Sequence, residues 1–148
     1  MSEWSQSAAR RSRQRLEAKF QLERKAVQDK ETLDSKGRAL WTSVKGVLAR
    51  KCEEFNAEPG NKGVLGLIGT QTELTVRCSG QPQNITGSFN FDSISFSGKN
   101  GINFETAVYI RLTKDGMDVW LADGGDNPVD FDNAANEIIE AVLEGSGR

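Results

Sequence analysis

One stretch limits the fold of this chain more than any other, and it runs from Ile102 to Leu112. Every second side chain in it is apolar or Thr, and the side chains between them are mostly polar. A period of two over this length predicts an amphipathic β-strand with one face on a core. The repeating positions are Ile102, Phe104, Thr106, Val108, Ile110 and Leu112.

A turn and a second strand follow this stretch. The sequence Asp115-Gly116 suits the two central positions of a type I′ turn, and the alternation resumes at Met117, Val119 and Leu121. With that turn, Leu112 faces Val119, Ile110 faces Leu121, and Arg111 faces Trp120 across the hairpin. The turn and the alternation therefore predict the same register.

A long helix is predicted over residues 8–57, which contain no proline and are rich in Ala, Leu, Lys, Arg, Glu and Gln. Its second half has a broad apolar stripe that belongs on a sheet, made by Trp41, Val44, Leu48, Cys52 and Phe55. Its first half has only Leu16, Phe20 and Val27, too few to bury in a monomer. We therefore expect residues 1–37 to form a projecting basic helical arm, either continuous or broken near 34–37 with Ser35 as the new N-cap.

The remaining residues, 38–148, are predicted to form a single α+β domain. Strands are expected at 64–68, 73–79, 85–97, 102–112 and 117–121, and a closing helix at 129–144, capped by Asp130 or Asp132. The fold class is thus α+β: a long N-terminal helix, a five-stranded antiparallel meander, and a C-terminal helix packed on one face of the sheet.

The strand at 85–97 has two interpretations. Phe89 and Phe91 fall on odd positions but Ile94 and Phe96 on even ones, so a β-bulge at Asp92-Ser93 is needed to place all four on one face. The loop at 98–101 is expected to pair Phe96 with Ile102, and Ile94 with Phe104.

The two interpretations differ in what they predict for the second sheet face. Without the bulge, Phe89, Phe91, Tyr109 and Trp120 form an aromatic patch there, with Arg111 stacked on the Trp120 ring. With the bulge, both Phe residues join the core, and Tyr109 and Trp120 are scattered surface residues.

Residues with obvious chemistry are few. The chain has no histidine, and its two cysteines, Cys52 and Cys78, lie on separate elements, so we expect them to be buried small hydrophobes. The acids Asp123, Asp126, Asp130 and Asp132 lack the spacing of a calcium loop, and turn and capping roles explain them. No enzyme, metal site or cofactor is predicted.

Charge is strongly segregated along the chain. Residues 1–51 hold 13 Lys or Arg against 6 Asp or Glu, whereas residues 52–148 hold 6 against 15. The densest basic cluster comprises Arg10, Arg11, Arg13, Arg15 and Lys19. Such a cluster indicates either phosphate binding on a nucleic acid or a solvated helix face attracted to the acidic half.

Three functions follow as hypotheses. The first is a non-enzymatic interaction protein, a homo-oligomer that self-associates through the long helix or the aromatic face. The second is nucleic-acid binding through the arginine cluster, and the third is a carrier of a small apolar ligand between helix and sheet, with Thr86, Ser88 and Asn90 near the mouth. The sequence predicts no membrane span or secretory signal, and a cytoplasmic protein is expected.

Overall fold

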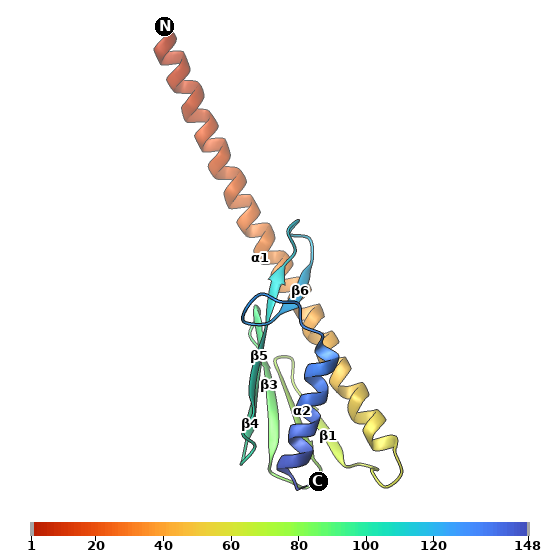
Figure 1. Cartoon of the computed structure of the whole chain (residues 1–148). Helices are drawn as coiled ribbons and strands as arrows, with labels where there is room; N and C mark the ends of the chain where they lie inside the picture. The colour runs from red at the N-terminus through yellow and green to blue at the C-terminus, as the bar shows by residue number, and fades with distance from the viewer. Residues whose placement is uncertain (1, 148) are drawn as a thin grey trace.

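The computed structural model describes residues 2–147, which form two helices and one six-stranded sheet (Figure 1). All neighbouring strands are antiparallel and follow chain order across the sheet. The predicted α+β class is confirmed, with six strands in place of five. The elements are α1 (Glu3–Ala57), β1 (Leu65–Gly69), β2 (Glu73–Cys78), β3 (Asn84–Phe89), β4 (Ser93–Lys99), β5 (Glu105–Leu112), β6 (Val119–Ala122) and α2 (Phe131–Gly145).

Helix α1 is continuous, so the alternative with a break near 34–37 is wrong. Asp34 accepts a hydrogen bond from Arg38 Nε at 3.2 Å, an i,i+4 ion pair that spans the expected break. Gly37 is the one buried glycine of α1, and a Cβ there would lie 3.1 Å from the carbonyl oxygen of Phe91. The glycine therefore permits close packing of helix on sheet and does not end the helix. Ser2 caps α1, its Oγ accepting from Ser5 N.

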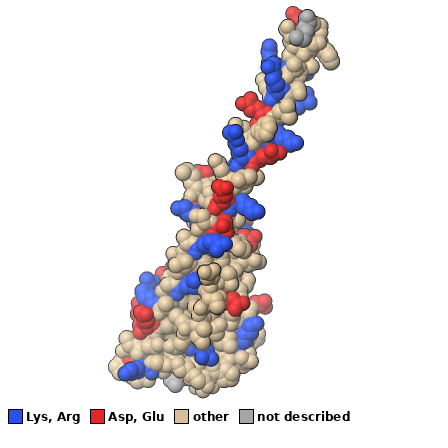
Figure 2. All heavy atoms as spheres, turned by 180° about the vertical axis from the view of Figure 1, so that it is seen from behind, with Lys and Arg blue, Asp and Glu red and all other residues tan. Residues whose placement is uncertain are grey.

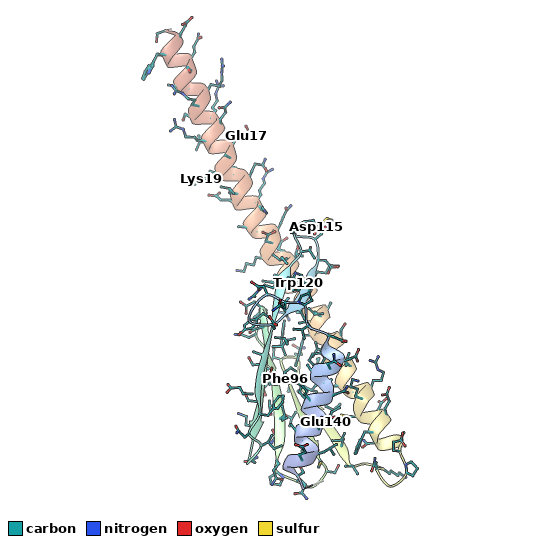
Figure 3. All side chains as sticks on the ribbon, in the orientation of Figure 1. Glu17, Lys19, Phe96, Asp115, Trp120 and Glu140 are labelled. Atoms are coloured by element: carbon teal, nitrogen blue, oxygen red, sulfur yellow. The ribbon has the colours of Figure 1, made fainter. Side chains whose placement is uncertain are left out.

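The core lies between the helices and one face of the sheet. The second half of α1 contributes the predicted stripe, of which Trp41, Val44, Leu48 and Cys52 are buried. Phe96 of β4 lies inside this layer (Figure 3), and its ring is 5.8 Å from that of Phe131 at the start of α2. Asp130 caps α2, accepting from Asp132 N.

The segment 85–97 is two strands joined by a turn, so neither the bulged nor the unbulged single strand is correct. Phe89 pairs with Ile94, and both are buried. The turn residue Phe91 has φ 60°, which bulky side chains seldom adopt. Asn90 and Asp92, on either side of it, are residue types that favour turns.

The connection from β4 to β5 is longer than predicted, and the expected pairing is wrong. Phe96 pairs with Thr106, and Ile94 with Val108. Asn100 and Gly101 both have positive φ, and the chain after them turns inward so that Ile102 is buried at the end of the core. Ile102 is thus a core residue but not part of a strand.

The β5–β6 hairpin has the predicted register. Ile110 pairs with Leu121, Arg111 with Trp120, and Leu112 with Val119. The turn itself differs, because Thr113 N donates to Asp118 O and only Gly116 of the expected central pair has positive φ. A four-residue loop and a two-residue loop preserve the same register, since both have an even number of residues.

Each edge of the sheet has a local contact that pairs part of the edge strand. Along β1, the side-chain amide of Asn56 makes two hydrogen bonds of 2.9 Å to the backbone of Leu65. Along β6, Ala122 pairs with Pro128 in an isolated bridge. These contacts block the unpaired strand edges that otherwise recruit further strands.

Candidate interaction surfaces

The first half of α1 extends beyond the sheet as an arm, which we define as residues 3–28 (Figure 1). None of these residues is buried. At a rise of about 1.5 Å per residue the arm is about 39 Å long. Large apolar side chains remain in water on it: Leu16 is 55% exposed, Phe20 62% and Val27 57% on one side, and Trp4 73% and Leu22 70% on other sides. Apolar side chains that are exposed together on one side of an element are a feature of interaction sites, whereas scattered ones need no explanation.

The apolar stripe of the arm continues the one that covers the sheet. Phe20, Val27, Trp41 and Leu48 are separated by multiples of seven residues, so they form one continuous line that drifts around α1 by about 20° every seven residues. Trp41 and Leu48 are buried on the sheet, whereas Phe20 and Val27 have no sheet beneath them. The arm therefore has an apolar face like the one that packs on the sheet, but no part of this chain within residues 2–147 packs against it.

The predicted basic cluster lies on the arm, and all its members, Arg10, Arg11, Arg13, Arg15 and Lys19, are exposed. Within residues 2–147 no ion pair includes any of them. Lys and Arg side chains stand on both sides of the arm in Figure 2, because these positions are distributed around the helix. They do not form one basic face.

A regular charge pattern that runs along the arm to its base was missed when only the cations of the arm were considered. Arg10, Glu17, Arg24 and Glu31 follow one another at intervals of seven residues, and their signs alternate. Seven residues bring a helix back to within about 20° of the same direction, so the four form one ridge, which we call the charge ridge. It runs beside the Leu16, Phe20, Val27 stripe. Heptad spacing of opposite charges was the signal that could have revealed it.

A hollow of about 650 Å³ lies where the arm meets the body. Arg38 lies over the ring of Phe91, 5.2 Å from its centroid, and the Phe91 side chain is 47% exposed. The hollow is mainly apolar and acidic, and its lining comprises Lys30, Glu31, Leu33, Asp34, Asn90, Phe91 and Asp92.

A smaller groove, of about 410 Å³, lies at the far end of the body between α1 and α2. Phe55, Ile139 and Leu143 contribute its apolar side chains, and Glu140, labelled on α2 in Figure 3, is one of its acids. Glu17 and Lys19 on the arm lie at the opposite end of the molecule in the same view.

The predicted aromatic patch does not form, because its members lie on opposite sides of the sheet. Phe89 is buried beneath α1 with its ring stacked 5.8 Å from that of Trp41. Tyr109 and Trp120 are on the outer face. Arg111 lies over the Tyr109 ring at 5.1 Å, and not over Trp120 as predicted. Its Nε donates to Asp126 at 3.0 Å, which draws the guanidinium away from the indole.

The three residues expected at the mouth of a ligand cavity are separated. Thr86 and Ser88 alternate with the buried Ile85 and Phe89 on β3, so they lie on the outer face, away from the helices. Thr86 Oγ1 is 3.2 Å from Thr75 Oγ1 in the neighbouring strand. Only Asn90 lines a hollow, the one at the base of the arm.

Few groups in the described residues have perturbed protonation. Cys52 and Cys78 are buried and unpaired, as predicted. Burial raises the pKa of the Cys52 thiol to about 11, and the nearby Glu53 carboxylate adds to the rise. Backbone N–H groups of Asn127 and Gly125 lower the pKa of the Asp123 carboxyl, and the Thr113 hydroxyl lowers that of Asp115. Within residues 2–147 no three His, Cys, Asp or Glu side chains are grouped as metal ligands would be.

Comparisons with protein-family models, with curated proteins and with solved structures gave no match. The search for membrane spans found that neither described helix has a segment apolar enough to cross a bilayer. The arm and the surfaces at its base are therefore the features on which a proposal for function depends.

Proposed function

We propose that this chain is a non-enzymatic interaction protein that self-associates through its N-terminal arm. The observation that supports this is the exposure of Leu16, Phe20 and Val27 on one side of a helix that is otherwise solvated. Full burial of an exposed side chain of this size is worth about 1.5–3 kcal/mol, and these three, which are 55–62% exposed, would each gain roughly half of that. A helix in a protein also gains most of its stability from packing of its apolar face, and the arm lacks such packing within residues 2–147 of one chain.

The arm is a better candidate than the outer face of the sheet. On that face Tyr109 and Trp120 are half-buried, and the outward residues of β4 are Ser93, Ser95 and Ser97. The unpaired, buried thiols of Cys52 and Cys78 fit a reducing compartment, and we infer a cytoplasmic location from them.

Sedimentation velocity over a range of concentrations tests the proposal. We expect the average mass to rise with concentration for the native chain, and the triple variant Leu16→Ser, Phe20→Ser, Val27→Ser to remain monomeric. The matched control is Ile68→Ser with Met117→Ser, which replaces side chains of comparable exposure off the arm. A native chain that stays monomeric at every concentration contradicts self-association.

A second function, binding to nucleic acid, is favoured by one observation. The arm has seven Lys or Arg against three Glu, and all seven are exposed. Contact with phosphates releases counterions, so affinity depends on the number of cations and falls steeply with salt. Fluorescence anisotropy on labelled DNA and RNA at two salt concentrations tests it. Replacement of any two arm arginines by Glu should weaken binding similarly, wherever they lie on the helix. Equal anisotropy with and without the protein at low salt rejects this function.

A further inference from the structure

We infer that two copies of this chain pair through their arms in an antiparallel, two-fold arrangement, with each charge ridge facing the ridge of the other copy. The inference rests on the proposed self-association and specifies its geometry. The occupant of the arm's apolar face is thus a second copy of the chain.

The signs along the ridge carry the inference. Read forward from Arg10 the charges are positive, negative, positive, negative, and read backward from Glu31 they are the opposite. A ridge of this kind matches itself only when the second copy runs the other way. Antiparallel pairing then places Arg10 opposite Glu31 and Glu17 opposite Arg24, and two-fold symmetry repeats both pairs.

The same register brings the apolar side chains together. The symmetry axis that pairs Arg10 with Glu31 passes between residues 20 and 21. The two Phe20 side chains then meet near the centre of the contact. Leu16 of one copy faces the level of residue 25 in the other, about 3 Å along the axis from Val27. The stripe is therefore covered on both copies at once.

The register also brings the tip of each arm to the base of the other. The first turn of one arm reaches the level of Gly37 in the second copy, beside the hollow that contains Phe91, and the Trp4 side chain lies on the side away from the stripe. Arg10, which this register places level with Glu31, approaches Glu31, Asp34 and Asp92, the acids of that hollow. The stripe and the hollow at Phe91 thus share one partner.

Arg10 and Glu31 of one chain cannot pair with each other, because α1 is continuous and the two residues lie about 31 Å apart along it. Within residues 2–147 no ion pair includes any of the four ridge residues. The complementary charges are available to another molecule.

Charge reversal on the ridge tests the inference. Arg10→Glu with Arg24→Glu makes the ridge wholly acidic, and Glu17→Lys with Glu31→Lys makes it wholly basic. Each double variant replaces four attractive pairs by four repulsive ones, so we expect the dimer dissociation constant to rise on the order of 100-fold. An equimolar mixture of the two should form a 1:1 heterodimer, measured by sedimentation with one component labelled.

The matched control is Arg11→Glu with Lys25→Glu, which changes the net charge as much as the acidic ridge variant does. Arg11 and Lys25 lie on the other side of the helix, and we expect self-association to be unchanged. Ridge variants that dimerise as well as this control overturn the inference, and so does a mixture that fails to form the heterodimer. In either case the proposed function stands if the apolar triple variant is still monomeric.

Orientation has its own test. Spin labels on cysteines introduced at Gln6 should lie about 43 Å apart along the axis in the antiparallel dimer, whereas labels at Gln21 should lie close together. Both positions are exposed, whereas the native thiols are buried. Short distances for both labels indicate a parallel pair and reject the two-fold antiparallel arrangement.

Discussion

Asn56 completes the edge of the sheet by pairing its side-chain amide with the backbone of Leu65. Its Nδ2 donates to Leu65 O and its Oδ1 accepts from Leu65 N, both at 2.9 Å. The amide thus replaces a neighbouring strand at that position. Because it lies near the end of α1, it also fixes the helix to the first strand across the intervening loop.

Replacement of Asn56 by Ala should lower the free energy of unfolding by about 1–3 kcal/mol, since it leaves a backbone donor and acceptor at a buried residue without partners. Urea denaturation measures the change. Asn133→Ala is the control, because Asn133 is exposed and its side chain makes no hydrogen bond within residues 2–147. Equal stability of the two variants contradicts a structural role for the amide.

Two glycines of α1 should respond oppositely to the same substitution. Gly37→Leu should destabilise the protein by about 1–3 kcal/mol, because even a Cβ there meets Phe91 O at 3.1 Å. Gly46 has no neighbour within 4 Å of its Cβ position, so Gly46→Leu should stabilise by about 0.5–1 kcal/mol through helix propensity. Thermal and urea unfolding measure both. A neutral Gly37→Leu variant is the result that would argue against close packing at this point.

Stability should fall in acid partly because of Asp123. Hydrogen bonds from Asn127 and Gly125 hold the pKa of this carboxyl below its usual value in the folded state. A lowered folded pKa stabilises the protein above the unfolded value of about 3.9, and this contribution disappears as the pH falls through the folded pKa. We expect the Tm of Asp123→Asn to decrease less between pH 5 and pH 3 than that of the native chain. Glu105→Gln serves as the control, and an identical decrease in all three proteins speaks against the loop contacts.

The native thiols should be almost unreactive. Burial keeps the Cys52 thiol protonated, with a pKa of about 11, and Cys78 is also buried. Since the thiolate is the nucleophile, alkylation at pH 8 should be slow in the folded protein and fast in urea. Mass spectrometry after timed iodoacetamide treatment measures this. Rapid labelling of Cys52 without denaturant is incompatible with the buried position.

The spacing of apolar residues predicted most of β5 and the packed half of α1, with a period of two in the strand and a helical period in α1, and together with the turn it predicted the hairpin register. Leu74, Val76 and Cys78 on β2 are buried together, as their spacing predicts. Periodicity works there because each of these elements has one buried face and one wet face.

The predictions were wrong at turns, where backbone conformation determines the direction of the chain. Nothing in the spacing of Phe89 and Ile94 distinguishes a bulge from a turn, and the turn at Phe91 lacks the Gly or Pro that usually marks one. Ile102 continues the period of β5 but leaves the strand, because burial at the end of the core requires only an apolar side chain. The charge ridge was readable from the sequence once sign and spacing were considered together.

The unbroken path of α1 has a mechanical consequence. A hinge at 34–37 would let the arm rotate relative to the sheet. A rigid continuous helix instead fixes the position of the sheet relative to the partner that binds the arm. In the paired arrangement Trp41 of one copy would stand about 60 Å along the axis from Trp41 of the other. The paired helices would then hold the two sheets at a fixed separation. The hydroxyl-lined face of each sheet would be accessible, and the two sheets would not contact each other.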